Sequence, residues 1–136
     1  MARMYLDANV FISYFRGEIG ANYRGLFVEA EKVLDFLHVN GHTVVISSLC
    51  LKEIETVSYI RKTELEDLFK RKNITTEFVT NPEYLDWKPF EKIGIHYPDA
   101  LHVALAIYYQ CEAIITFNVH DFLPAKKIRI IDPREL

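Results

Sequence analysis

Four acidic residues spread along the chain are the strongest candidates for chemistry. They are Asp7, Glu53, Asp99 and Asp121. Two unit charges about 4 Å apart repel by roughly 4 kcal/mol at an effective dielectric of 20, so a cluster of these carboxylates needs a cation. Oxygen ligands without cysteine suit Mg²⁺ or Mn²⁺ better than zinc. One or two such ions would orient a phosphodiester, lower the pKa of an attacking water and neutralise the leaving oxygen, which is metal-assisted phosphodiester hydrolysis.

Five short runs rich in β-branched and apolar residues are predicted to form strands. They are Arg3–Leu6, Thr43–Ser47, Thr75–Val79, Ala113–Thr116 and Ile128–Ile131. Helical patterns separate these runs, and parallel strands need such crossover connections. The sequence therefore predicts an α/β fold, a three-layer α/β/α sandwich with a central parallel sheet.

The segments between the runs carry apolar residues at helical spacing. The pattern predicts helices over Ala8–Phe15, Tyr23–Val39, Ser48 to about Lys72, Asn81 to Phe90 and Pro98–Tyr109. Pro89 indicates that the fourth of these is bent or broken. The last is apolar on nearly every side, which predicts a central, buried helix.

The carboxyl edge of the predicted sheet is where a ligand would bind, because open parallel sheets bind ligands beyond the ends of their strands. Asp7 follows the first strand directly, Glu53 lies in the first turns of the helix after the second, and Asp121 follows the fourth. These three acids are expected at that edge. Asp99 begins the buried helix that precedes the fourth strand, and periodicity leaves open which edge this helix start faces.

Length and composition predict a single domain over residues 1–136. The chain is 50% hydrophobic and 26% charged, and domains usually have roughly 100–200 residues.

The sequence has two cysteines, Cys50 and Cys111, which are too few for a zinc ribbon or a disulfide framework. The N-terminus lacks the apolar region of a signal peptide, and the longest strongly apolar stretch is far below the ~18 residues of a membrane span. We expect a cytoplasmic protein with no membrane contact.

The net charge of −3 by itself argues against binding a polyanion. Two local runs of basic residues oppose this average, namely Arg61 with Lys62, Lys70, Arg71 and Lys72, and Lys126 with Lys127 and Arg129. Such runs are usually solvated surface. Two bound divalent ions would offset the net charge, however, so the distribution of charge matters more than its sum.

Each of the four acids has an ordinary alternative role. Asp7 could cap the short helix Ala8–Phe15, and Asp99 could complement a helix dipole. Glu53 could be solvated, and Asp121 could be a turn residue. His96, His102 and His120 flank the acids and offer a zinc set instead, although a histidine on an apolar helix is usually a hydrogen-bonded core residue. A Ser/His/Asp triad lacks the glycines of a nucleophile elbow, and the sequence has no Gly-rich phosphate loop.

Four blocks of the sequence resemble, in order, the motifs of PIN-domain nucleases. They are YLDANVFISYFRGE (Tyr5–Glu18), ISSLCLKEIE (Ile46–Glu55), YPDALHVALA (Tyr97–Ala106) and ITFNVHDF (Ile115–Phe122). The resemblance implies that Asp7, Glu53, Asp99 and Asp121 are the catalytic and metal-binding acids, supported by Asn9, Ser47, Thr116 and Asn118. Cys50 departs from the family, which often has threonine there. Family members place the last acid at the Asn118 or the Asp121 position, and we favour Asp121.

The length of the chain resembles that of single-domain VapC-type toxins. This resemblance implies the strand order 3-2-1-4-5 and an Mg²⁺- or Mn²⁺-dependent endoribonuclease that acts on RNA as the toxin of a toxin-antitoxin pair. It also implies a VapB-type antitoxin as partner and a homodimer.

Two other classes compete with this interpretation: a catalytically silent PIN-like RNA-binding or scaffold module, and a phosphoacceptor receiver domain. The receiver is disfavoured because no acid neighbours Asp7, and because Lys126 and Lys127 precede the last strand.

Overall fold

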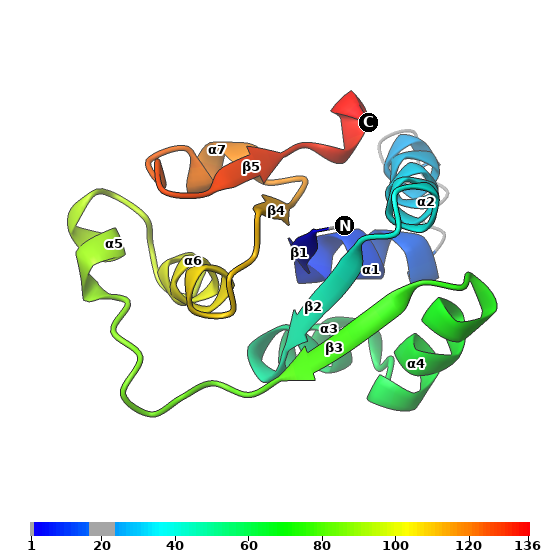
Figure 1. Cartoon of the computed structure of the whole chain (residues 1–136), viewed down its shortest axis with the longest axis horizontal. Coiled ribbons are helices and arrows are strands. Elements are labelled where there is room, and N and C mark those ends of the chain that lie inside the picture. The colour runs from blue at the N-terminus through cyan, green and yellow to red at the C-terminus, as the bar shows by residue number, and fades with distance from the viewer. Residues whose placement is uncertain (1, 17–23) are drawn as a thin grey trace.

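A parallel sheet with helices on both faces forms the centre of the molecule (Figure 1). The computed structural model describes residues 2–16 and 24–136. In this part of the chain the strands are β1 (Arg3–Leu6), β2 (Thr43–Ser47), β3 (Thr75–Val79), β4 (Ala113–Ile115) and β5 (Arg129–Ile131). Their order is β3-β2-β1-β4-β5, and every neighbouring pair is parallel. The predicted fold class and strand order are confirmed.

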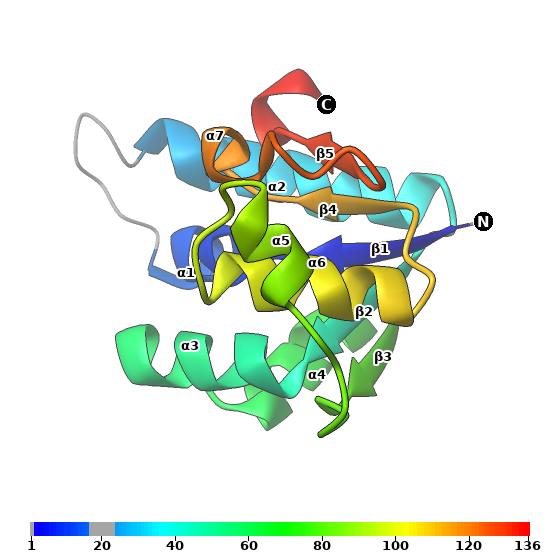
Figure 2. The same ribbon diagram turned by 90° about the vertical axis from the view of Figure 1, so that its left-hand side faces the viewer.

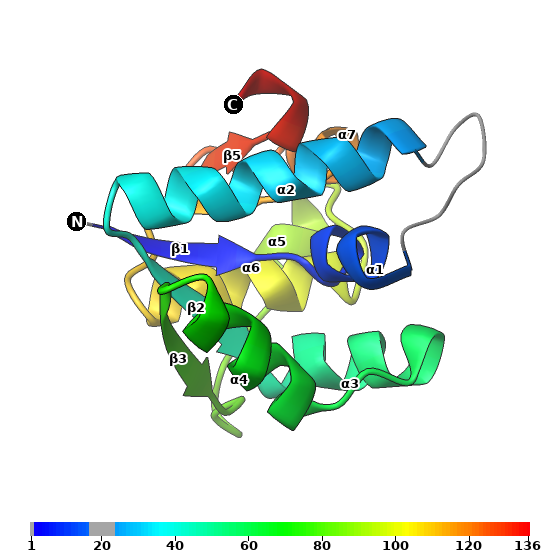
Figure 3. The same ribbon diagram turned by 90° about the vertical axis from the view of Figure 1, so that its right-hand side faces the viewer.

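The helices form two layers, one on each face of the sheet (Figures 1 and 3). The first four cover one face, the next three cover the other, and a short 3-10 helix ends the chain. They are α1 (Ala8–Arg16), α2 (Arg24–Val39), α3 (Ser48–Ser58), α4 (Lys62–Arg71), α5 (Lys88–Lys92), α6 (Asp99–Tyr108), α7 (Val119–Phe122) and η1 (Pro133–Glu135).

Alternation along the strands divides the core between these two layers, because successive side chains of a strand point to opposite faces. Met4 and Leu6 of β1 pack with the layer of α1 to α4, whereas Tyr5 packs with the layer that contains α6. Every residue of α6 from 100 to 106 is buried, as its apolar sequence predicts. No helix within residues 2–16 and 24–136 is long and apolar enough to span a membrane.

The long helix predicted from Ser48 to about Lys72 is wrong, since the structure has two helices there, α3 and α4. Tyr59 ends α3 in the left-handed conformation, with φ of 63°, and its N–H donates to the carbonyl of Glu55. At the start of α4, the Glu64 side chain accepts from the backbone N–H of Arg61. These local end signals outweigh an apolar spacing that continues across the break.

The helix predicted from Asn81 to Phe90 is also wrong. No helix covers residues 81–87, and α5 begins only at Lys88, with Pro89 in its first turn. Proline is well tolerated there because the first turn has no internal acceptor for its missing N–H. The other predicted bounds differ from the observed ones by at most one residue. Tyr23 and residues 17 and 18 of the first sequence block lie outside the described residues.

The direction of α6 answers the question that periodicity left open. This helix connects β3 to β4, which are parallel, so it runs back against the strands and starts at their carboxyl edge (Figure 2). Asp99, its first residue, therefore lies at the same edge as the end of β1.

Candidate functional site

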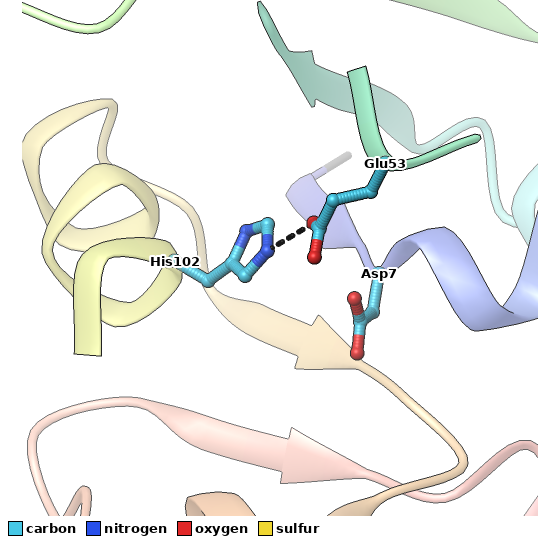
Figure 4. A group of neighbouring side chains, drawn as sticks. All are labelled: Asp7, Glu53 and His102. Carbon is cyan, nitrogen blue, oxygen red and sulfur yellow. Dashed lines mark hydrogen bonds and ion pairs between the residues drawn. The ribbon is translucent and has the colours of Figure 1, made fainter. Parts of the chain in front are cut away.

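Three side chains from three separate elements converge at the carboxyl edge of the sheet (Figure 4). Asp7 follows β1, Glu53 lies on α3 and His102 lies on α6. One carboxylate oxygen from each acid and one ring nitrogen lie within 4.8 Å of one another. Asp7 is 7% exposed and His102 is 1% exposed, whereas the Glu53 side chain keeps 33% of its exposure. The cluster is thus buried on one side and open to solvent at Glu53.

Asp7 is held in this cluster by hydrogen bonds to both of its carboxylate oxygens. The backbone N–H of Ala8 donates to Oδ1 at 2.7 Å, and the hydroxyl of Thr116 donates to Oδ2 at 2.8 Å. Burial nevertheless raises the pKa of Asp7, and the charge of Glu53 adds to this effect. A buried carboxylate whose ionised form is disfavoured is a favourable position for a cation.

Thr116 links Asn9 and Asn118 to Asp7. Its hydroxyl oxygen accepts from the Asn9 side-chain amide at 3.2 Å and from the backbone N–H of Asn118 at 3.0 Å. Asn9 in turn accepts from the backbone N–H of Phe117 at 3.4 Å. Asn9 and Thr116 therefore act through their side chains, whereas Asn118 contributes its backbone amide and its side chain is exposed.

Glu53 ends a chain of buried hydrogen bonds that starts at Ser47. The Glu53 carboxylate lies 2.6 Å from Nε2 of His102, and Nδ1 of that ring lies 2.5 Å from the hydroxyl of Tyr5. The Tyr5 hydroxyl lies 2.7 Å from Oγ of Ser47, which also accepts from the backbone N–H of Cys50 at 3.1 Å. Ser47, Tyr5 and His102 are each at most 1% exposed.

The charges around His102 outweigh the effect of its burial. Burial alone would lower the pKa of this ring, but the hydrogen bond with Glu53 and the charges of Asp7, Glu53 and Asp99 raise it overall. Burial likewise raises the pKa of Tyr5 well above its usual value. Tyr5 is therefore a neutral hydrogen-bonding group in this chain.

Asp99 and Asp121 line a cavity of about 300 Å³ at the same edge. Its other lining residues include His96, His120 and Pro124. Desolvation raises the pKa of Asp99 to about 6, and the charges of Asp7, Asp121 and Glu53 contribute to this rise. The four acids therefore lie in one electrostatic neighbourhood, although Asp99 and Asp121 stand outside the tight group formed with His102.

Sequence reasoning placed Asp7, Glu53 and Asp121 at this edge and left the edge of Asp99 open. It expected a histidine on an apolar helix to be a hydrogen-bonded core residue, as His102 is, but it missed the partners of His102 and the role of Tyr5. Two signals were present. Tyr5 precedes Asp7 by two residues on a strand and so shares its face, and His102 follows Asp99 by three residues on a helix. His96 and His120 are exposed and do not join the tight group.

Comparisons with known proteins agree with the fold. The family model for the PIN domain matches residues 4–123. Among solved structures, the chain is similar to one in the crystal structure of VapBC2 from Rickettsia felis bound to a DNA fragment from their promoter, with a TM-score of 0.63 and 20% sequence identity. The similarity covers 96% of this chain and 98% of that chain, and at this identity it shows the fold alone. A comparison with curated proteins found no match.

Proposed function

The chain belongs to the PIN-domain family, and on this premise we propose that it is an Mg²⁺- or Mn²⁺-dependent endoribonuclease that hydrolyses RNA phosphodiester bonds. The observation that carries the proposal is the convergence of Asp7 and Glu53 with His102, beside a cavity lined by Asp99 and Asp121. Carboxylates repel one another at such spacing unless a cation lies among them.

The residues present fit a hard divalent cation. Asp7 and Glu53 offer carboxylate oxygens within 4.8 Å of each other, and oxygen is the ligand that Mg²⁺ and Mn²⁺ prefer. Burial raises the pKa of Asp7 by more than the nearby charge of His102 and the hydrogen bonds lower it, so a cation would relieve an existing cost. We propose Asp7, Glu53, Asp99 and Asp121 as the metal-binding and catalytic residues.

The residues around the proposed cation site then have different roles in the proposed reaction. When bound, the cation supplies Lewis-acid chemistry, which activates water and neutralises the leaving oxygen. Ala8 and Thr116 fix both oxygens of Asp7, and His102 fixes Glu53. Asp99 and Asp121 add two carboxylates on the side of the cavity, where the phosphate of the substrate would enter.

A second cavity supports RNA as the substrate. It has a volume of about 580 Å³ and shares Pro124 with the cavity of Asp99 and Asp121. Pro89, Phe90 and Ile93 form an apolar wall, and Lys126 and Lys127 form a basic one. An unpaired nucleotide next to the cleaved bond would place its base on the apolar wall and its phosphate near the lysines.

Removing both lysines should weaken RNA binding. We expect Lys126→Ala with Lys127→Ala, in an Asp99→Asn background that binds without cleaving, to lower the slope of log affinity against log salt by roughly 1 to 2. The measurement is fluorescence anisotropy of a labelled single-stranded 12-nucleotide RNA at several salt concentrations.

A matched pair of basic residues provides the control. Lys70 and Arg71 are exposed at the end of α4, just before β3 begins, and so lie near the amino edge of the sheet. Lys70→Ala with Arg71→Ala removes the same charge and should leave the slope unchanged. If the two double variants have equal slopes of log affinity against log salt, Lys126 and Lys127 do not contact the RNA.

The physiological role is also part of the proposal. From the similarity of the fold to a chain of a VapBC2 complex, we propose a toxin that pairs with a VapB-type antitoxin and forms a homodimer. The free cysteines Cys50 and Cys111 are compatible with the reducing cytoplasm, where we propose that the protein acts. We further propose that residues 1–136 constitute a single PIN domain.

Metal-dependent cleavage tests the proposal directly. The purified protein should cleave labelled RNA in Mg²⁺ or Mn²⁺, lose all cleavage in EDTA, and leave a DNA of the same sequence intact. If no RNA is cut and calorimetry detects no Mn²⁺ binding at millimolar concentration, the chain is instead a silent PIN-like binding or scaffold module.

A further inference from the structure

With His102 as a neutral imidazole, the hydrogen-bond chain from Ser47 to Glu53 has two possible directions, and they give His102 opposite roles. In the first, Nε2 of His102 carries a proton and donates it to Glu53, while Nδ1 accepts from the Tyr5 hydroxyl. In the second, Nδ1 carries a proton and donates to Tyr5. Only the second leaves the Nε2 lone pair available for a cation. Nε2 faces the Glu53 carboxylate at 2.6 Å, and one ring nitrogen of His102 lies within 4.8 Å of a carboxylate oxygen of Asp7.

Ser47 decides between the two directions. Its Oγ accepts from the backbone N–H of Cys50, as the start of α3 requires, and its own proton needs a buried acceptor because Ser47 is fully buried. Within the described residues, the Tyr5 oxygen is the remaining hydrogen-bond partner of that hydroxyl. Buried donors are almost always satisfied in folded proteins, so Ser47 donates to Tyr5.

The orientation of the Tyr5 hydroxyl then fixes the direction of its hydrogen bond with His102. Since its oxygen accepts from Ser47, its own proton points to the other neighbour, Nδ1 of His102. A proton on Nδ1 would turn the Tyr5 hydroxyl back toward Ser47 and leave the Ser47 proton without an acceptor. The arrangement that satisfies every group therefore has Nδ1 unprotonated and a proton on Nε2.

We propose that Ser47 and Tyr5 hold His102 with its proton on Nε2, so that His102 is a positioning residue that donates to Glu53 and is not itself a metal ligand. The metal part of this inference rests on the proposed function, since it takes Glu53 as a ligand. Glu53 keeps one third of its side-chain exposure, and the His102 hydrogen bond restricts its carboxylate to one orientation. Because Nε2 donates its proton to Glu53, it cannot bind a metal, and the site offers only oxygen ligands. Such a site favours Mn²⁺ over zinc.

Nuclear magnetic resonance of the metal-free protein tests the direction without any activity. With ¹⁵N-labelled histidine at pH 8.5, long-range ¹H–¹⁵N spectra should show His102 protonated at Nε2 and unprotonated at Nδ1, with His102→Gln used for assignment. Tyr5→Phe should shift the Nδ1 resonance of His102 to that of a ring nitrogen without a hydrogen bond. A proton on Nδ1 in the wild-type protein would overturn the proposal.

Metal titrations of two His102 variants test its role as a donor. Glutamine can place an amide N–H where Nε2 lies, whereas asparagine is one carbon shorter and reaches only the position of Nδ1. We expect His102→Asn to weaken Mn²⁺ binding by roughly 10- to 100-fold, the range for groups that orient a ligand, and His102→Gln to restore most of the affinity.

The ratio of zinc to manganese affinity separates a donor from a ligand. Each His102 variant should change both affinities by the same factor, measured by calorimetry after circular dichroism has confirmed the fold. A loss of zinc affinity in His102→Gln that exceeds the loss for Mn²⁺ by tenfold would make His102 a ligand and refute the inference. If the wild-type protein binds neither metal, the proposed function fails, whereas the resonance data still decide the direction of the hydrogen bonds.

Discussion

Replacing Asp7 with asparagine is expected to lower the rate of RNA cleavage by roughly 10³-fold or more while the protein stays folded. In the proposed mechanism, Asp7 offers its buried carboxylate to a cation, and metal ions supply several kcal/mol of transition-state stabilisation. Each 1.36 kcal/mol changes a rate about tenfold. Asparagine has the same shape but no charge, so it should lose this contribution.

The stability of the Asp7→Asn protein should change little in the absence of metal. Its single carbonyl oxygen can accept from Ala8 or from Thr116 but no longer presents two acceptors to both, and a typical lost hydrogen bond costs about 1 kcal/mol. The variant also removes a carboxyl group whose ionised form is disfavoured by burial, as its raised pKa indicates. This gain offsets the cost of the lost hydrogen bond. We expect a melting temperature equal to or slightly above that of the metal-free wild type.

Two measurements separate catalysis from folding in this variant. Saturating Mn²⁺ should raise the melting temperature of the wild type, because binding to the folded state stabilises it by about 2.7 kcal/mol at one hundred times the dissociation constant, and should not raise that of Asp7→Asn. Asp35→Asn makes the same chemical change at an exposed position on α2 and should keep full activity. Undiminished cleavage by Asp7→Asn at saturating Mg²⁺ would refute the proposed mechanism.

The strands and the edge that carries the acids were predictable because both follow from local patterns. Short β-branched runs alternating with helical segments indicate a parallel sheet, and residues that directly follow parallel strands must share an edge. This reasoning placed Asp7 and Glu53 together, as the structure has them. Thr116 was predicted inside a strand that ends at Ile115, yet its N–H still donates to Ile131 as a strand residue would.

The breaks in the helices and the partners of Glu53 were not predictable from periodicity. The left-handed conformation at Tyr59 separates α3 from α4, although tyrosine gives no such signal in the sequence. The hydrogen bond from His102 to Glu53 depends on how closely α3 and α6 approach across the sheet edge. Such distances are set by packing of the whole core, which no local pattern encodes.

The metal-free protein is expected to be more stable at pH 5 than at pH 7.5. Asp99 has a pKa of about 6 in the folded protein against an ordinary value of 3.8. Between these values the folded state binds more protons than the unfolded state, so stability falls as pH rises. The pKa of Asp7 is also raised, and the raised pKa of His102 acts in the same direction above pH 6.5.

The size of this effect follows from Asp99 and its partial exposure. A shift of one unit corresponds to about 1.36 kcal/mol, but the half-buried side chain is screened by solvent, so we expect about 1 kcal/mol in total. For a chain of 136 residues this corresponds to a difference in melting temperature of roughly 3 to 5 °C. Calorimetric melts in EDTA between pH 5 and pH 7.5 measure it.

Manganese should reverse the order of stability. A cation binds the ionised carboxylates, so its affinity falls as pH drops through the pKa of Asp99, and its stabilisation is largest at pH 7.5. Asp99→Asn should flatten much of the slope seen in EDTA, whereas Asp35→Asn should preserve it. A metal-free stability that instead rises from pH 5 to pH 7.5 would mean that burial and mutual repulsion do not disfavour the ionised carboxylates at this edge, and the physical reason for a cation there would be lost.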